Sequence, residues 1–320
     1  MEEVYVGVDI GGTNTVIGLF NRDLNLIAKT VIATTKPHFP PKTNNPREFF
    51  DELTNTIESI LMQFATDLRL AGVGMGVPGK VNAQQGTALE ATNLGWYDVP
   101  ISSEMSQRLG TYVQVDNDVR TYTLGESKVG AAKGYQDVIC VTLGTGLAAG
   151  IMVDGKLVKG SDWCAGEIGH DFVPGQTFRC NCGRQGCLET IASATGIVRL
   201  AEEAVKGGVD TCLKLLNRPI TAVDVCEAAI HGDNVSLSLF QFIGTELGSK
   251  LTTAVFLLNP EVIIIGGGVS AAGDILLRPL RERIYSIYGN SGHPKIVAST
   301  LGDSAGVYGA AHLAMNSGEL

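Results

Sequence analysis

Two short glycine-rich turns in the sequence have the residue types that bind phosphate. The first comprises Asp9, Ile10, Gly11, Gly12, Thr13 and Asn14, and the second comprises Gly144, Thr145 and Gly146. Bare glycines allow backbone N–H groups to point into a turn as an anion site, and an aspartate at a strand end can orient a hydrated magnesium ion. A single turn of this kind could equally be an ordinary hairpin turn. Two copies favour a pair of phosphate-binding turns that grip one nucleotide polyphosphate.

A third glycine run and two known glycine motifs help to decide which type of nucleotide-binding site the sequence encodes. Gly266, Gly267 and Gly268 end a predicted buried strand and offer flat access for an adenosine. The residues 74–79 match the spacing of a dinucleotide fingerprint, but turn sequence follows them where that fingerprint needs a helix. No G-x-x-x-x-G-K-[ST] motif occurs. A nicotinamide site and a P-loop are therefore disfavoured, which leaves the paired turns.

Three of the seven cysteines lie within eight residues, namely Cys180, Cys182 and Cys187. Together with the nearby His170 they supply three sulfurs and one nitrogen, the donor set of a closed tetrahedral zinc site. The glycines at 183 and 186 would let the chain wrap tightly around such an ion. Buried free thiols are the alternative, and this interpretation suits the other four cysteines, at 140, 164, 212 and 226. The sequence predicts a structural zinc ion at the cluster.

A carboxylate follows the short strand predicted at 112–115. Asn117 and Asp118 stand where that strand ends, which is where cleft residues gather in α/β folds. A carboxylate there can accept the proton of an attacking hydroxyl during phosphoryl transfer. Asp118 could instead be only the N-cap of the helix predicted over 118–129.

The elements that carry these residues repeat along the chain. One phosphate-type turn joins strands predicted at 4–9 and 16–20, and the other joins strands predicted at 138–143 and 147–153. The recurrence of strand, Gly/Thr turn, strand and polar turn at domain-sized separation indicates an internal duplication. We therefore expect two related α/β domains that face each other across a cleft. The expected domains are 1–117 plus about 303–320, and 118–302 with the zinc loop.

Composition limits the kinds of partner. The 320 residues are 44% hydrophobic and 18% charged, which is typical of a folded, enzyme-sized protein. The formal net charge of −9 gives no general attraction to nucleic acid or to an acidic membrane. The N-terminal residues lack an export signal, and the most apolar stretch is too short and interrupted to span a bilayer. A cytoplasmic protein without membrane or nucleic-acid partners is expected.

These motifs together resemble the ROK family, the sugar kinases and repressors of the actin-like ATPase superfamily. The resemblance spans nearly the whole chain and rests on six blocks: residues 9–14, Gly76-Val77-Pro78-Gly79, Asn117-Asp118, residues 144–146, Glu167-Ile168-Gly169-His170, and residues 180–189. The last two blocks are highly specific. The resemblance implies a two-domain actin-like ATPase fold of the ribonuclease H-like α/β type.

The resemblance also implies a reaction and a set of contacts. It implies that ATP with Mg²⁺ phosphorylates a hexose, with Asp118 as the catalytic base. The side chains or backbone expected to hold the sugar are those of Gly79, Asn93, Asn117, Asp118, Glu167, His170 and Glu189. Glucose, phosphorylated at its 6-hydroxyl, is the first choice of substrate. N-acetylmannosamine or another N-acetylhexosamine follows, then fructose or allose. A homodimer is expected by family analogy.

A sugar-responsive repressor is the alternative from a different class. Repressors of this family carry an additional N-terminal helix-turn-helix, whereas the first strand here is predicted to begin at residue 4. The chain also departs from the family pattern at two positions. Arg120 stands where asparagine is frequent, and Ala148 stands where a further glycine is common. These departures bear on the shape of the pocket and on the nucleotide contacts.

Overall fold

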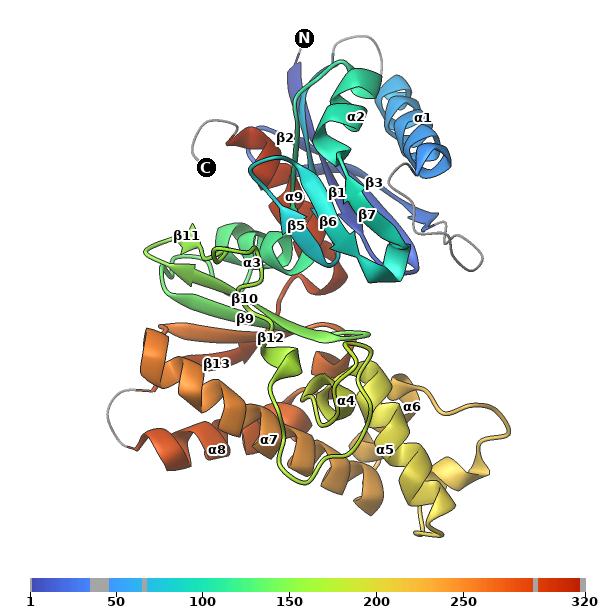
Figure 1. Ribbon diagram of the computed structural model, residues 1–320, viewed down its shortest axis with the longest axis vertical. Coiled ribbons are helices and arrows are strands. Elements are labelled where there is room, and N and C mark those ends of the chain that lie inside the picture. Colours follow the sequence, from blue (N-terminus) through green and yellow to red (C-terminus); the bar gives the residue numbers. More distant parts are fainter. Residues whose placement is uncertain (1, 35–45, 65–67, 290–292, 317–320) are drawn as a thin grey trace. The chain divides into compact units, whose positions relative to one another are not determined.

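The computed structural model describes residues 2–34, 46–64, 68–289 and 293–316, which form a mixed α/β protein (Figure 1). The chain divides into two compact units, which are described separately. The first unit comprises residues 1–133, 159–164 and 303–320, and the second comprises 134–158 and 165–302. The last four residues of the domain expected to end at 320 lie outside the described residues.

The first unit extends beyond the boundary that the sequence predicts at residue 117. Its helix α3 (Asp118–Val129) packs closely on α9 (Ala305–Met315). The contact requires two glycines: a Cβ on Gly125 would lie 2.0 Å from the carbonyl oxygen of Ala305, and one on Gly309 would lie 1.7 Å from that of Thr121. Because this backbone-to-backbone contact holds α3 against α9, the helix belongs to the first unit.

The sheet of the first unit has the strand order β3-β2-β1-β4-β8. Strands β1 to β3 are antiparallel neighbours, and β4 and β8 run parallel to β1. The strands are β1 (Glu2–Ile10), β2 (Asn14–Asn21), β3 (Leu26–Ala33), β4 (Leu68–Val77) and β8 (Val113–Asn117). Buried β-branched residues such as Val6, Val73 and Val115 favour the strand conformation in β1, β4 and β8.

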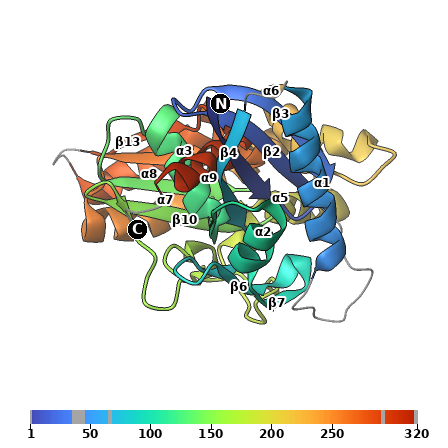
Figure 2. The same ribbon diagram turned by 90° about the horizontal axis from the view of Figure 1, so that it is seen from above.

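Helices cover both faces of this sheet. Helices α1 (Arg47–Gln63) and α2 (Ile101–Leu109) bury Phe50 and Met105 in the core on one face (Figures 1 and 2). Helix α9 packs on the other face, where Gly7 and Gly74 leave room for its backbone. A small second sheet, order β5-β6-β7, is formed by β5 (Lys80–Asn82), β6 (Thr87–Ala91) and β7 (Trp96–Val99), with the 3-10 turn η1 (Thr92–Leu94) between the last two.

The sheet of the second unit repeats the first in topology. Its order is β11-β10-β9-β12-β13, again with two antiparallel hairpin pairs followed by two parallel strands. The strands are β9 (Val138–Leu143), β10 (Leu147–Val153), β11 (Lys156–Leu157), β12 (Val262–Gly266) and β13 (Lys295–Ala298). The internal duplication predicted from the two glycine hairpins is confirmed, because each hairpin occupies the same place in its sheet.

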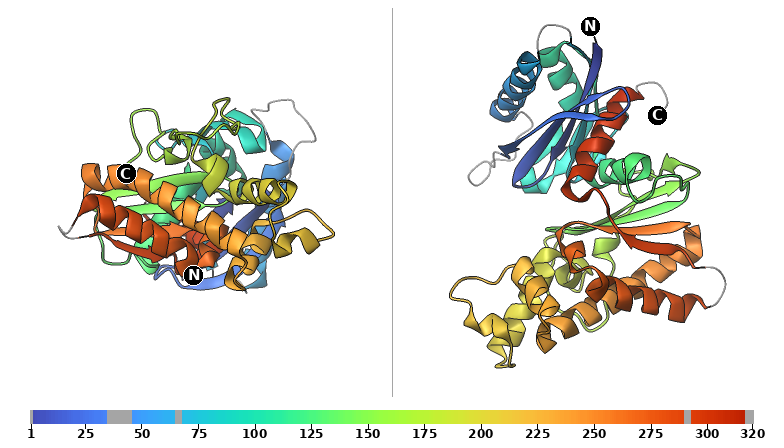
Figure 3. Two further views of the ribbon diagram at one scale, coloured as in Figure 1. Left: turned by 90° about the horizontal axis from the view of Figure 1, so that it is seen from below. Right: turned by 180° about the vertical axis from the view of Figure 1, so that it is seen from behind.

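The core of the second unit is largely helical. Long helices α7 (Asn234–Leu258) and α8 (Asp274–Tyr288) lie side by side (Figures 1 and 3). The remaining helices of this unit are α4 (Glu189–Ala192), α5 (Ala194–Lys206) and α6 (Ala222–Ile230), with 3-10 turns η2 (Ile168–His170), η3 (Cys212–Leu215) and η4 (Gly268–Ala272). The 3-10 turn η5 (Gly302–Ser304) precedes α9 in the first unit. Among the described residues, no helix combines the length and apolar character needed to cross a membrane.

Candidate functional site

The turn between β1 and β2 is held in shape by the end of β3. The N–H of Gly11 donates to the carbonyl of Asn14 at 2.9 Å, which closes the turn. From the β3 side, the hydroxyl of Thr34 donates to the carbonyl of Gly11, and the N–H of Thr34 donates to that of Thr13, both at 2.8 Å. Thr13 itself is exposed. The hydrogen bonds from Thr34 therefore fix the backbone of the turn, and the Thr13 side chain remains at the surface.

Asp9 stands just before this turn among other carboxylates. Burial, followed by the negative charges of Asp118 and then Asp303, raises the pKa of Asp9 from 3.8 to about 7. The carboxyl packs against Gly306 at the start of α9, where a Cβ would lie 2.2 Å from Asp9 Oδ2. Burial and the neighbouring negative charges disfavour the ionised form of Asp9. A bound cation would restore that form, so the carboxylate is suited to bind one. Asp303 is a site neighbour that the sequence did not indicate.

The end of β8 shows which residue caps α3, and so bears on the interpretation of Asp118 as a helix cap. The N-cap of α3 is Asn117, whose Oδ1 accepts the N–H groups of Val119 and Arg120 at 3.0 and 3.1 Å. Asp118 is the first residue of the helix, and its Oδ1 accepts the N–H of Val119 and the amide of Asn117 at 2.9 and 2.8 Å. The capping role therefore belongs to Asn117, while Asp118 presents a partly exposed carboxylate at the strand end.

Gly79 is brought to the same place. The side-chain amide of Asn117 donates to the Gly79 carbonyl at 3.0 Å. Gly79 has a φ of +88°, and a Cβ there would lie 2.2 Å from the carbonyl oxygen of Glu90, so only glycine fits between these strands. The structure thus joins Gly79, Asn117 and Asp118 directly. Asn93 is exposed in η1, which follows β6, the strand against whose end Gly79 packs.

The second glycine turn is held by hydrogen bonds from a helix rather than from a strand end. The N–H of Gly144 donates to the carbonyl of Gly146 at 3.0 Å, and the start of α5 holds the turn from outside. Ala194 N–H donates to the Gly144 carbonyl at 2.8 Å, and the hydroxyl of Thr195 donates to the Thr145 carbonyl at 3.0 Å. The run 266–268 lies beside this turn, since a Cβ on Gly267 would lie 2.5 Å from the carbonyl oxygen of Leu143. The residues predicted for triphosphate and adenosine in this unit are therefore neighbours.

The loop of Glu167 and His170 is fastened to β10. Gly166 has a φ of +94°, and a Cβ there would lie 1.7 Å from the Ala149 carbonyl oxygen; at Gly169 the corresponding distance to Leu147 is 2.0 Å. The N–H of Ala149 donates to the Gly166 carbonyl at 2.8 Å. Gly166, just before the motif, and Gly169 within it are thus both required by the close approach of the loop to the strand. As a result, Glu167 Oε2 lies 3.7 Å from His170 Nε2.

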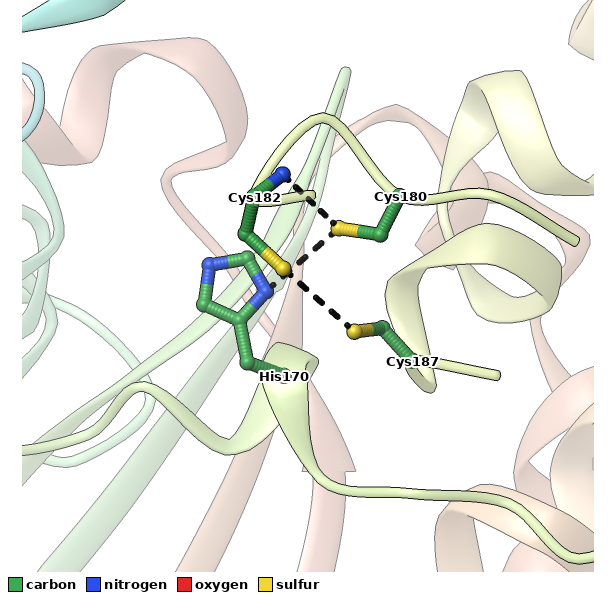
Figure 4. A group of neighbouring side chains, drawn as sticks. All are labelled: His170, Cys180, Cys182 and Cys187. Carbon is green, nitrogen blue, oxygen red and sulfur yellow. Dashed lines mark hydrogen bonds between the residues drawn. The ribbon is translucent and has the colours of Figure 1, made fainter. Parts of the chain in front are cut away.

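His170 and the three cysteines form one cluster (Figure 4). Their ligand atoms all lie within 4.8 Å of one another. The Sγ atoms of Cys182 and Cys187 are 3.6 Å apart, and Cys180 Sγ is 3.7 Å from His170 Nδ1. Zn–S bonds of about 2.3 Å and a Zn–N bond of about 2.1 Å in a tetrahedron require separations of about 3.8 and 3.6 Å. The donor positions therefore fit a zinc ion.

The chemistry of the cluster also fits a cation. Burial acts to raise the pKa of the Cys182 thiol, but hydrogen bonds from Arg184 and from the neighbouring cysteines outweigh it and bring that pKa down to about 6. Burial raises the pKa values of Cys180 and Cys187, so these two thiols need a nearby positive charge to become thiolates. Gly183 and Gly186 have φ values of +88° and +77°, as the tight wrapping of the loop requires. Glu189 joins the cluster to the second turn. Its Oε1 accepts the thiol of Cys180 at 2.8 Å, and its Oε2 would lie 3.2 Å from a Cβ on Gly146.

A pocket opens beside the cluster. It has a volume of about 630 Å³, in the range of small-molecule sites. Its walls within the second unit are formed by Glu167, His170, Asp171, Phe172, Arg184, Gln185 and Cys187. Two of the residues predicted to hold a sugar, Glu167 and His170, therefore line a space large enough for one.

The two departures from the family pattern have different surroundings. Ala148 lies in β10, paired with Thr142 across the hairpin and partly buried. Arg120 lies in the first turn of α3, with 2% of its surface exposed, and its guanidinium contacts Asp116 and the segment 159–164. Neither Asp116 nor this segment was predicted to have a role. Asp116 and Arg120 are four residues apart, but Asp116 lies in a strand, so that spacing does not indicate a helical ion pair.

Comparison with known proteins identifies the relatives of the chain. The family model described as "ROK family" matches residues 5–317. A glucokinase of Halalkalibacterium halodurans is 36% identical over 95% of this chain and 93% of its own length, and a glucokinase of Thermotoga maritima is 33% identical over 96% of both. The crystal structure of a ROK family glucokinase from Streptomyces griseus, in complex with glucose and AMPPNP, is 32% identical with a TM-score of 0.83, covering 98% of this chain and all of that one. The expected actin-like α/β fold is confirmed, and the chain belongs to the ROK family.

Proposed function

We propose that the protein is an ATP-dependent hexose kinase that transfers the terminal phosphoryl group of ATP to the 6-hydroxyl of glucose. The observation that carries the proposal is the assignment of helix capping to Asn117, which leaves the Asp118 carboxylate at the strand end without that role. The similarity to glucokinases over nearly the whole chain supports both the reaction and the substrate.

In the proposed reaction Asp118 is the general base. Its carboxylate accepts the proton of the 6-hydroxyl as that oxygen forms a bond to the γ-phosphorus, and the bond to the β–γ bridging oxygen breaks to release ADP. Asn117 supports Asp118 by donating its amide to Oδ1. Because Asn117 also donates to the Gly79 carbonyl, one side chain bonds both the proposed base and the backbone at Gly79.

The nucleotide is assigned to the two glycine turns. Gly11, Gly12, Thr13 and Asn14 in the first unit and Gly144, Thr145 and Gly146 in the second offer N–H groups and hydroxyls to the phosphates. Gly266, Gly267 and Gly268 are proposed to receive the adenosine, a role supported by the close contact of Gly267 with Leu143. Asp9 is proposed to orient hydrated Mg²⁺, whose charge offsets the carboxylate repulsion that raises the Asp9 pKa.

The sugar hydroxyls are assigned to Gly79, Asn93, Asn117, Glu167, His170 and Glu189. A structural zinc ion held by Cys180, Cys182, Cys187 and His170 Nδ1 is proposed to fix the imidazole, since its Nε2 then remains free to bond a hydroxyl. That nitrogen lies beside Glu167 and at the pocket wall. When bound, the zinc ion supplies rigidity and no chemistry of the phosphoryl transfer.

A phosphorylation panel tests the proposal. The protein is incubated with ATP, Mg²⁺ and one sugar at a time from glucose, N-acetylglucosamine, N-acetylmannosamine, fructose and allose, and kcat/KM is compared. Glucose is expected to give the largest value and glucose 6-phosphate as product. A larger kcat/KM for an N-acetylhexosamine would transfer the proposal to that substrate, and no turnover on any sugar would overturn it.

The proposal also covers the oligomeric state, the cellular location and the partners of the protein. By family analogy we expect a homodimer, acting in the cytoplasm, where ATP is available, and without a nucleic-acid partner. The net charge of −9 supports the absence of nucleic-acid binding. Sedimentation of the purified protein and titration with duplex DNA at low salt test the first and third properties, and sequence-specific duplex binding would favour the repressor alternative.

A further inference from the structure

Arg120 is an unusual residue for the first turn of a helix at a proposed acceptor site. It is 2% exposed, and each of its guanidinium nitrogens donates to a different segment of the first unit. Nε donates to Asp116 Oδ1 on β8 at 2.5 Å, Nη1 to the Trp163 carbonyl at 3.1 Å, and Nη2 to the Val81 carbonyl on β5 at 3.1 Å. One planar group thus ties together β8, β5, α3 and the segment 159–164.

The partner of Arg120 leads directly to the proposed base. Asp116 is fully buried, and the Oδ1 that accepts Arg120 also accepts the backbone N–H of Asn117 at 2.7 Å. Its Oδ2 accepts no hydrogen bond from the described part of the chain, and Lys159 Nζ lies 4.0 Å from that oxygen. A buried carboxylate with so few partners depends strongly on the arginine. The position of Asn117, and through it that of Asp118, therefore depends on this ion pair.

The segment at the other end of Arg120 is held in an unfavourable conformation. Trp163 has a φ of +65°, in the left-handed region that a bulky residue rarely adopts. Its carbonyl receives Nη1 of Arg120, so the arginine stabilises this conformation. Strained backbone is retained where surrounding contacts enforce it, and such positions gather at functional sites. The segment leads three residues later into Gly166 and then into Glu167, which is assigned to the sugar site.

We propose that Arg120 is a positioning residue for the sugar-acceptor site, an inference that rests on the proposed kinase reaction. Its guanidinium fixes the Asn117–Asp118 pair through Asp116 and the 159–164 segment through Trp163, and so aligns both with the acceptor hydroxyl. Lysine cannot replace it, because a single ammonium cannot reach three acceptors in one plane. The asparagine that is frequent here in the family is too short to do so.

The test uses Arg120→Lys, with Trp163 as an internal reporter. Trp96 and Trp163 are the two tryptophans of the chain, so Trp96→Phe leaves a single emitter in the segment that Arg120 holds. In that background Arg120→Lys is expected to shift the Trp163 emission to the red and to increase its quenching by acrylamide. With ATP and glucose, kcat is expected to fall about tenfold to a hundredfold and KM for glucose to rise at least about fivefold, with KM for ATP within about twofold. A lower folded fraction would reduce kcat but leave both KM values unchanged.

Arg281→Lys is the matched control. Arg281 likewise donates to a backbone carbonyl, that of Ile296, and to an aspartate, Asp274, but in the second unit and outside the proposed site. It is expected to leave the emission and all kinetic constants close to the Trp96→Phe background. If Arg120→Lys does not fold, Asp116→Asn in the same background is expected to raise KM for glucose and shift the emission in the same direction.

Two results would overturn the proposal. One is an unchanged KM for glucose and unchanged Trp163 emission in a folded Arg120 or Asp116 variant of an active enzyme. The other is an equal change in Arg281→Lys. Failure of the proposed function is distinguishable, because the unsubstituted protein would then phosphorylate no sugar of the panel.

Discussion

The two units share one sheet topology but hold their functional loops by different means. The residue two positions before the first turn glycine is Asp9 in the first unit and Thr142 in the second. Around Asp9 the first unit gathers the carboxylates of Asp118 and Asp303, and nearby the buried Asp116 pairs with Arg120. The second unit places a cysteine–histidine cluster beside its turn, linked to it through Glu189.

The contrast shows how a duplicated scaffold acquires separate tasks. Strand order and hairpin turns are retained in both units, because they are fixed by backbone pairing. The charged residues around the turn of the first unit are not retained around the turn of the second, where Thr142 stands in place of Asp9. In the first unit negative charge is concentrated where a cation and an attacking hydroxyl are proposed. The buried ion pair of Asp116 and Arg120 holds the end of β8 in place there. In the second unit the sugar-binding loop is proposed to be stiffened by zinc.

The largest expected effect is on the proposed base. Asp118→Asn removes the proton acceptor but retains an Oδ1 that can still accept the hydrogen bond from Val119. We expect kcat with glucose to fall by about 10⁴-fold, because that is the upper range for loss of a general base, while glucose affinity changes by less than about fivefold. Rapid-quench kinetics and equilibrium binding measure the two quantities.

The matched control for this variant is Asp154→Asn, which makes the same chemical change at an exposed aspartate in the β10–β11 turn. Its kcat should equal that of the unsubstituted protein. Turnover retained by Asp118→Asn would contradict the assignment of the chemistry to the first unit.

A second prediction concerns the charge on Asp9. Because its pKa in the folded protein is raised to about 7 from 3.8, the folded state binds this proton more tightly than the unfolded chain does. The resulting stability is fully present below about pH 3.8 and is lost as the pH rises through 7. The loss is up to about 4 kcal/mol. Asp9→Asn should therefore raise the free energy of unfolding at pH 8, but not at pH 4, in magnesium-free buffer.

Denaturant unfolding at the two pH values measures this difference. Thr142→Val, at the corresponding position of the second unit, serves as the control, since no titratable group is altered there. If the unsubstituted protein and Asp9→Asn have parallel stability profiles between pH 4 and 8, the carboxylate crowding proposed for the first unit is absent.

A third prediction concerns the metal. Cys187→Ser is expected to abolish bound zinc and to raise KM for glucose by about 10- to 100-fold, because His170 and the loop to Glu189 lose their common anchor. Cys226→Ser replaces a buried thiol outside the cluster and should retain one zinc per chain and an unchanged KM. Elemental analysis and initial-rate kinetics provide the measurements. Folded, active protein that contains no zinc would refute the proposed brace of the second unit.

The smallest expected effect compares two adjacent glycines. Gly267 has a φ of +79°, and a Cβ there would collide with the Leu143 backbone, whereas a Cβ on Gly268 would meet no atom within 4 Å in the described structure. Gly267→Ala should lower the free energy of unfolding by about 1–2 kcal/mol and raise KM for ATP. Gly268→Ala should be nearly neutral in both. Equal effects of the two variants would argue against the close contact between the 266–268 run and the second turn.

Much of the fold followed from local patterns. The hairpin strands predicted at 138–143 and 147–153 and the helix predicted at 118–129 agree with the structure, because alternating apolar residues and capping residues act over short distances. The structure also shows a capping box at the start of α6, formed by Thr221 and Asp224. The small sheet β5-β6-β7 was missed, since its strands are three to five residues long. Helix α8, which contains Pro279, was also missed, because a proline ordinarily interrupts a helix.

The sequence by itself determined the family, the duplicated hairpins and the identity of the zinc-type donors, because each is encoded by residue types at fixed short spacings. Tertiary structure alone decided that Asn117 rather than Asp118 caps α3, that α3 belongs with α9, and that Asp303 raises the pKa of Asp9. It also decided that Arg120 joins four segments. These features depend on which atoms meet after folding, between positions up to about 300 residues apart, and pairing of that kind leaves no periodic pattern in a single chain.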